Sequence, residues 1–65
     1  MRIDTVKLDL CLARAELTDR RLREYVSSNT MQRARRGEEL KPPTVGKIAR
    51  ALGVDPAEIV KEVEQ

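Results

Sequence analysis

Residues 26–43 read VSSNTMQRARRGEELKPP, a polar and basic stretch in which apolar side chains are rare. Between residues 28 and 36 only Met31 and Ala34 are apolar. A helix that turns by about 100° per residue places both of them on one side. We therefore predict a helix over residues 28–36 that buries these two side chains and ends at Gly37, the expected left-handed residue of its C-terminal cap.

The other side of this predicted helix carries hydroxyl, amide and guanidinium groups. Its outward residues are Ser28, Asn29, Gln32, Arg33 and Arg36. Such groups hydrogen-bond to base edges in the DNA major groove: arginine to guanine, asparagine or glutamine to adenine, and serine to either. An arginine-rich helix face is also often simply solvated, so the face alone leaves both interpretations open.

The distribution of charge favours the DNA interpretation. The net charge of the chain is only +2, but residues 20–36 hold six arginines and one glutamate. Residues 55–65, in contrast, hold four acids and one lysine. Such an asymmetry steers a polyanion to one face of a small protein.

Apolar periodicity and capping residues predict two helices before this one. The first spans about residues 5–15, with Asp4 or Thr5 as N-cap. It has two apolar stripes, one of Leu8, Cys11, Leu12 and Ala15, and one of Val6, Leu10, Ala13 and Leu17. The second runs from Thr18, its N-cap, to about Val26, and we expect Tyr25 to be half-buried in the core.

Two further helices are predicted after it. Residues 38–43 are expected to form a loop because of their two prolines, and Thr44 is the expected N-cap of a helix that ends at Gly53. The last helix begins with Asp55, Pro56 and Glu58 and is lined by Ile59, Val60 and Val63. The expected fold class is therefore all-α, with five short helices in one compact domain over residues 1–65.

Size and composition exclude most catalytic and metal chemistry. The chain has 65 residues, one cysteine, Cys11, and no histidine, so an internal disulfide and a zinc site are both excluded. Acid–base and nucleophilic chemistry have no evident residues. We expect no enzyme activity, cofactor, metal or small-molecule substrate. Since no apolar run approaches roughly 18 residues and no signal peptide is recognisable, we expect a cytoplasmic protein that does not enter a membrane.

The chain resembles the Cro- and repressor-type helix-turn-helix proteins, the XRE-like regulators with a lambda-repressor-like DNA-binding domain. The resemblance covers about residues 8–60 and is carried by TDRRL, SSNTMQRARRG and above all KPPTVGKIARALGVDPAEIV. It implies a compact five-helix fold with the helix-turn-helix at about residues 18–36. It also implies that the second helix of this motif reads operator DNA in the major groove and that a dimer regulates transcription.

The resemblance also implies roles for individual residues. Ser28 and Asn29 match the first base-contacting pair of the family, and Gln32 and Arg33 match its further base-reading positions. The positions assigned to DNA phosphates are Thr18, Thr30, Arg36 and Lys41. Arg35 falls where members carry glutamate or arginine, and it pairs either with DNA or with a neighbouring acid.

One departure from the family pattern concerns the turn. Members usually have a longer separation between the leucine of the second helix and the capping serine of the third. Here Leu22 and Ser27 are only five positions apart, and Glu24 and Tyr25 stand in place of the usual Ala-Gly pair. We therefore expect a shortened second helix or a rebuilt turn.

The leading hypothesis is a sequence-specific regulator that binds double-stranded DNA. Arginine and lysine contacts to phosphates supply most of the affinity in such proteins, and base contacts supply the discrimination. A domain of this size covers one half-site, so we expect a homodimer on a palindromic operator. The candidate dimer surfaces are Val6 and Leu10 on the first helix and Ile59 and Val63 on the last.

The alternative is a protein-interaction module, or an antitoxin or excision accessory factor, on the same fold. The altered turn and the acidic pair Glu38-Glu39 slightly favour it. This pair either points away from DNA or bonds to Arg35 or Arg36. DNA binding is expected to weaken steeply as salt rises, whereas an apolar protein interface is not.

Overall fold

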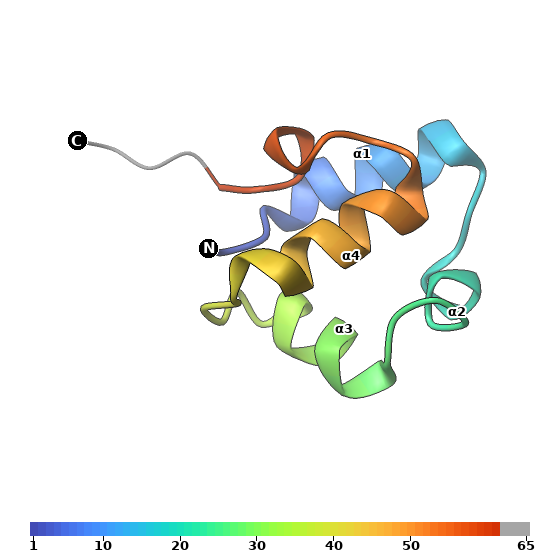
Figure 1. The fold of residues 1–65 in the computed structure, drawn as a ribbon. Helices are drawn as coiled ribbons and strands as arrows, with labels where there is room; N and C mark the ends of the chain where they lie inside the picture. Colours follow the sequence, from blue (N-terminus) through green and yellow to red (C-terminus); the bar gives the residue numbers. More distant parts are fainter. Residues whose placement is uncertain (62–65) are drawn as a thin grey trace.

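The computed structural model describes residues 1–61, which form helices around one apolar core. The helices are α1 (Thr5–Ala15), α2 (Asp19–Leu22), α3 (Ser28–Arg35) and α4 (Pro42–Leu52), followed by the 3₁₀ turn η1 (Pro56–Glu58) (Figure 1). Within the described residues there is no strand, and an isolated antiparallel bridge joins Ile3 to Val60. The all-α prediction is confirmed, with a 3₁₀ turn as the last helical element.

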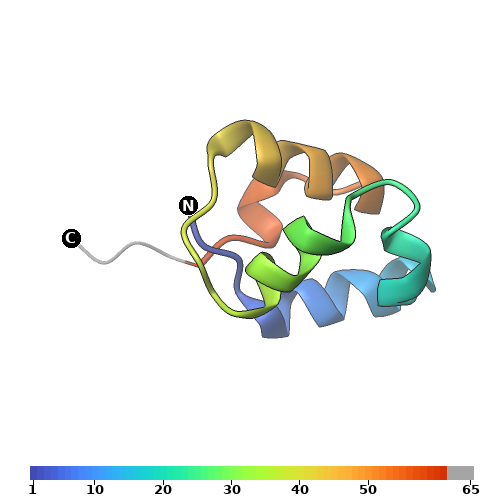
Figure 2. The same cartoon turned by 90° about the horizontal axis from the view of Figure 1, so that it is seen from below.

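The core lies where α1, α3 and α4 meet. α1 and α4 pack together, and the view from below shows α3 in front of both (Figure 2). The buried apolar side chains are Ile3, Leu8, Cys11, Leu12, Leu22, Val26, Met31, Ala34, Leu40, Val45, Ile48, Ala49, Leu52 and Ile59. No polar or charged side chain of residues 1–61 is buried. Polar groups are therefore left for the surface, and α3 contributes one whole face to it.

Helix α1 has the predicted bounds, and Asp4 is its N-cap. The Oδ1 atom of Asp4 accepts hydrogen bonds from the backbone N–H groups of Val6 and Lys7, at 2.9 and 3.1 Å. The predicted stripe of Leu8, Cys11 and Leu12 is buried, but Ala15 at the end of the helix is exposed. In the second stripe Val6, Leu10 and Ala13 are exposed, and only Leu17 packs partly against the core.

The predicted end of the second helix near Val26 is wrong, because α2 ends at Leu22, and of the two alternatives for this segment the structure has the shortened helix. Thr18 is its N-cap and accepts a hydrogen bond from the backbone N–H of Arg21 at 3.1 Å. The helix ends at Leu22, and residues 23–27 form the turn that leads into α3. Leu22 is buried, but the prediction of a half-buried Tyr25 is wrong, because the turn leaves this side chain 62% exposed.

Helix α4 begins three residues earlier than predicted. Pro42 and Pro43 occupy its first two positions, and Lys41, not Thr44, is the N-cap. The prediction of a loop at these prolines is wrong because the first turn of a helix has no partners for its N–H groups, so proline loses nothing there. The C-terminal end is confirmed at Gly53, which has a φ of 71°.

The predicted last helix is reduced to the turn η1. Asp55 and Glu58 form the expected capping box, with Pro56 at the first position. The chain then becomes extended, and the N–H of Lys61 donates to the carbonyl of Arg2 at 2.8 Å. Ile59 is fully buried, so its prediction as part of a dimer surface is wrong. Val63, the other residue predicted there, lies outside the described residues.

Candidate nucleic-acid interface

The buried and exposed faces of α3 divide as the helical periodicity predicts. Met31 and Ala34 are 1% and 0% exposed, and they hold the helix on the core. The four side chains predicted to read bases, Ser28, Asn29, Gln32 and Arg33, are all exposed. Because these four side chains are exposed, no other part of residues 1–61 covers this face, and the view from below shows α3 in front of α1 and α4 (Figure 2).

The N-terminal end of α3 is fixed by Ser27. The Oγ atom of Ser27 accepts a hydrogen bond from the N–H of Thr30 at 3.2 Å and donates to the Thr30 hydroxyl oxygen at 2.8 Å. Thr30, predicted to contact a phosphate, is only partly exposed. Because its hydroxyl accepts from Ser27, its own proton stays available for an acceptor such as a phosphate oxygen.

The other predicted phosphate contacts flank α3. Thr18 lies at the start of α2 and Lys41 at the start of α4, and these two segments lie toward opposite ends of the domain (Figure 1). Both residues are exposed, and Lys41 forms no ion pair with any described residue. The hydroxyl oxygen of Thr18 accepts the capping hydrogen bond from Arg21. Its hydroxyl proton can still be donated to a phosphate oxygen.

Arg35 is partly exposed and bonds two acids of neighbouring helices. Its guanidinium contacts Asp19 of α2 and Asp9 of α1, and the side chain is 28% exposed. The hydrogen bond to Asp19 is the main cause that raises the pKa of Arg35 above its ordinary value. Of the two alternatives for Arg35, the structure shows the neighbouring acid.

The acidic pair that follows α3 divides between two sets of partners. Glu38 bonds Arg33 and Arg36, at 3.3 and 3.1 Å. Glu39 bonds the Met1 ammonium group at 2.9 Å, and this group lowers the pKa of Glu39. The sequence analysis considered Arg35 and Arg36 as partners of these acids, and the structure has the pair of Glu38 with Arg36. Glu38 also bonds Arg33, which was not among the expected partners.

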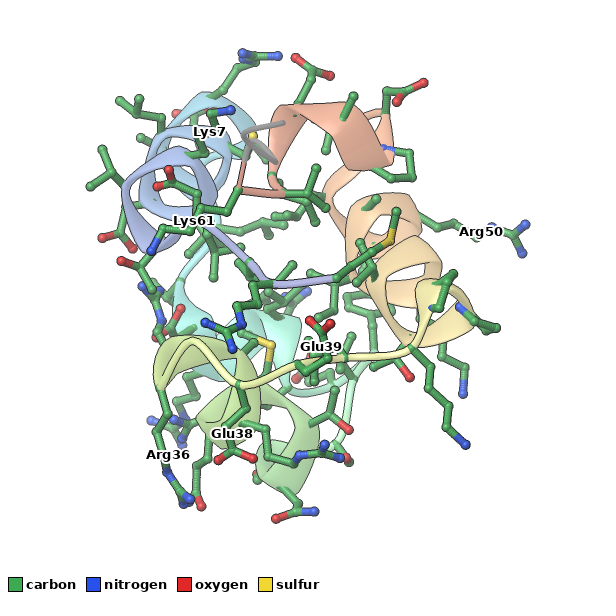
Figure 3. The ribbon with its side chains drawn as sticks, turned by 90° about the vertical axis from the view of Figure 1, so that its left-hand side faces the viewer. Lys7, Arg36, Glu38, Glu39, Arg50 and Lys61 are labelled. Atoms are coloured by element: carbon green, nitrogen blue, oxygen red, sulfur yellow. The ribbon has the colours of Figure 1, made fainter. Side chains whose placement is uncertain are left out.

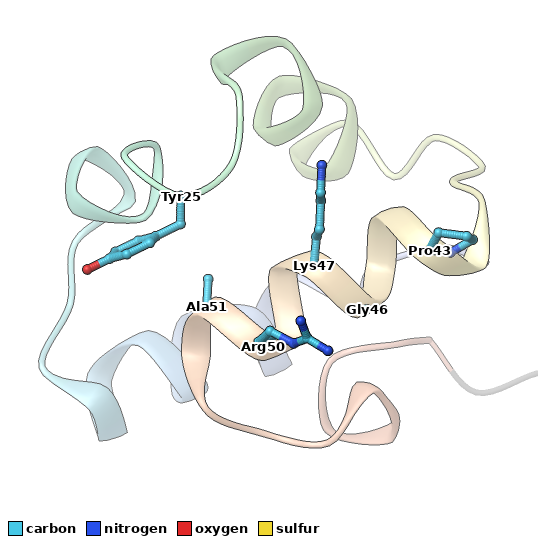
Figure 4. Close-up of a pocket in the computed structure, with 6 residues that line it drawn as sticks. All are labelled: Tyr25, Pro43, Gly46, Lys47, Arg50 and Ala51. Carbon is cyan, nitrogen blue, oxygen red and sulfur yellow. The ribbon is translucent and has the colours of Figure 1, made fainter.

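A groove runs between the turn after α2 and the outer face of α4. Its volume is about 690 Å³, and it is lined by Tyr25, Pro43, Gly46, Lys47, Arg50 and Ala51. Tyr25 and Ala51 lie at one end of the groove and Pro43 at the other, and Lys47 extends toward α3 (Figure 4). Neither Lys47 nor Arg50 forms an ion pair within residues 1–61.

Sequence analysis missed these two cations. Their spacing of three residues on the polar side of an amphipathic helix is the signal that indicates a shared exposed face. Among residues 1–61 no group of histidine, cysteine or acidic side chains has the arrangement of a metal site. Cys11 is buried, and its thiol lies 3.8 Å from the carbonyl oxygen of Glu58.

No family model, curated protein or solved structure matches this chain. None of the helices in the described residues is both long and apolar enough to span a bilayer.

Proposed function

We propose that this protein binds double-stranded DNA sequence-specifically and regulates transcription, with α3 as the helix that reads the major groove. In this proposal α2 and α3 form a helix-turn-helix of the lambda-repressor-like, XRE-type class. The observation that carries it is the division of α3 into a buried side, with Met31 and Ala34, and an uncovered side of amide, hydroxyl and guanidinium groups.

The chemistry of the uncovered side supports base reading. Asn29 and Gln32 each present a donor and an acceptor, which match the edge of adenine in the major groove. Arg33 presents a planar fork of donors, which matches the two acceptors of guanine. Ser28 lies in the first turn of α3, where its hydroxyl adds a further contact to a base of either kind.

Phosphate contacts would hold α3 in register. Lys41 and Arg36 are exposed cations at the two ends of the segment that joins α3 to α4, and Thr18 and Thr30 add hydroxyl donors. These groups carry no sequence information but supply affinity and orientation. A cytoplasmic location and the lack of enzyme activity remain predictions.

A homodimer on a palindromic operator is the assembly that we propose. Val6 and Leu10 are 67% and 63% exposed and lie one helical turn apart on α1. With Ile59 buried, these two are the residues of the predicted dimer surface that lie exposed within residues 1–61. Two side chains make a small patch, so we expect association to be weak in solution and to be completed on DNA, where two half-sites hold the copies together.

Salt dependence tests DNA binding. The affinity for a labelled duplex is measured by fluorescence anisotropy at several salt concentrations. Each phosphate neutralised by a lysine or arginine adds about −0.9 to the slope of log K against log salt. With Arg36 and Lys41 on phosphates, we expect a slope of about −2 or steeper per domain. Undetectable duplex binding at low salt would overturn the proposal.

The second candidate function is a protein-interaction module, and the groove beside Tyr25 favours it. This exposed aromatic ring, with an apolar floor and two cations, suits an acidic segment of a protein partner. Variants separate the two functions. The pair Tyr25→Ala and Arg50→Gln would abolish partner binding, whereas the pair Arg33→Ala and Arg36→Ala would abolish duplex binding. If only the variant with Tyr25→Ala and Arg50→Gln loses duplex binding, the DNA site would be assigned to the groove instead of α3.

A further inference from the structure

Glu38 joins two arginines of the face proposed to bind DNA. Its Oε1 atom accepts from Nε of Arg33 at 3.3 Å, and its Oε2 atom accepts from Nη1 of Arg36 at 3.1 Å. Figure 3 shows Glu38 beside Arg36 at the end of α3, whereas Glu39 lies farther along the loop. Both carboxylate oxygens of Glu38 are therefore occupied by residues assigned to bases and phosphates.

The backbone places Glu38 there. Gly37 has a φ of 75°, and this left-handed residue turns the chain back along α3. The N–H of Gly37 donates to the carbonyl of Ala34 and the N–H of Glu38 donates to the carbonyl of Arg33, each at 3.1 Å. These two bonds form a Schellman motif, which fixes the start of the Glu38 side chain against the last turn of the helix.

We propose that Glu38 is a specificity determinant, because its carboxylate competes with DNA phosphates for Arg33 and Arg36. This inference rests on the proposed DNA-binding function. On a non-cognate duplex, where phosphate contacts supply essentially all the affinity, Glu38 neutralises one of two neighbouring cations and repels phosphate oxygens. Non-specific binding is thereby weakened.

Binding to a guanine is affected less. Glu38 takes Nε of Arg33, and the backbone carbonyl of Glu39 accepts from Nη2 at 3.3 Å. Nη1 and the second hydrogen of Nη2 stay available, and together they form the end-on fork that suits the two acceptors of guanine. Glu38 and a guanine can therefore hold the same guanidinium at once, so the carboxylate penalises phosphate contacts more than the base contact.

The test is the variant Glu38→Gln, measured against a short mixed-sequence duplex by fluorescence anisotropy from low to moderate salt. We expect its affinity to rise about three- to tenfold at low salt and its salt slope to steepen by about one. The matched control is Glu39→Gln. It changes the net charge equally, but its carboxylate bonds Met1 and not the arginines of α3.

The outcomes separate the two proposals. A larger gain for Glu38→Gln than for Glu39→Gln, with a smaller gain on a selected site than on mixed sequence, supports the role of Glu38. Equal effects of the two variants, or a loss of affinity in Glu38→Gln, would overturn this role while DNA binding stands. If neither the wild type nor Glu38→Gln binds any duplex at low salt, the proposed function fails, and the role of Glu38 fails with it.

Discussion

Arg35 and Asp19 face each other in a two-pronged ion pair between α3 and α2. Nε of Arg35 donates to Oδ2 of Asp19 at 3.1 Å, and Nη2 donates to Oδ1 at 2.5 Å. The Nη1 atom also lies 2.8 Å from Asp9 on α1. Because a helix of four residues has no stability of its own, this bidentate contact and the burial of Leu22 hold α2 against α3.

The variant Arg35→Ala is expected to lower the free energy of unfolding by about 1–2 kcal/mol, a value reduced for the partial exposure of the side chain. The free energy is measured by chemical denaturation. Arg36→Ala is the matched control, since this adjacent side chain is 64% exposed and has Glu38 as its one ion-pair partner within residues 1–61. Its expected effect is below about 0.5 kcal/mol. Equal losses of unfolding free energy in the two variants would show that the contact with Asp19 stabilises the fold no more than an exposed ion pair does.

The variant Arg33→Ala is expected to relax the preference for one base pair in the operator. A bidentate contact to guanine discriminates by about 1–3 kcal/mol, so affinity for the preferred site should fall by that amount. The measurement compares duplexes that carry each of the four base pairs at every position. A uniform loss across all duplexes would assign Arg33 to phosphate instead.

The variant Arg36→Ala is expected to weaken the binding of all duplexes alike. Its guanidinium lies at the C-terminal cap of α3 and is assigned to a phosphate, which carries no sequence information. The salt slope should become less steep by about one. Titration of cognate and mixed-sequence duplexes measures both quantities, and a loss confined to one base position would contradict the assignment.

Acid is expected to destabilise the fold in part through Glu58. Arg14 of α1 donates to Oε1 of Glu58 at 3.0 Å, and the N–H of Asp55 donates to Oε2 at 3.2 Å. The hydrogen bond from Arg14 is the main cause that lowers the pKa of Glu58 from its ordinary value of 4.5. Since the folded pKa lies below the unfolded one, the ionised carboxylate stabilises the fold above about pH 4.5.

This contribution is lost as the pH falls through the folded pKa of Glu58. The variant Glu58→Gln should therefore melt at a lower temperature than the wild type at neutral pH, and the difference should shrink on acidification below pH 4.5. Thermal unfolding at several pH values measures it. A difference in Tm that stays constant down to the lowest pH would show that ionised Glu58 does not stabilise the fold.

The sequence predicts α3 well because the spacing of its apolar residues is compatible with one orientation of the helix. Only Met31 and Ala34 suit a core, and their spacing allows a single helical phase, so the exposed face follows directly. Thr18 and Gly53 were also identified correctly, because capping is a local interaction that the residue type largely determines. The observed helix α3 ends only one residue before the predicted end.

The remaining differences depend on contacts that lie outside any local pattern. Proline in the first turn of α4 is read as a helix breaker unless the start of the helix is already known. Ile59 has a helical context in the sequence, but it is drawn into the core, and Val60 pairs with Ile3 from the other end of the chain. The bonds of Glu38 and Arg35 likewise depend on side-chain directions that the sequence leaves open.

The central claim is that the uncovered face of α3 reads DNA sequence. It is tested most directly by selecting bound duplexes from a random pool with the wild-type protein and, in parallel, with Arg33→Ala. We predict that the wild type recovers a palindromic motif and that the variant recovers the same motif without its preference at one position in each half-site. Recovery of no motif by the wild type, or of an unchanged motif by Arg33→Ala, would contradict the account.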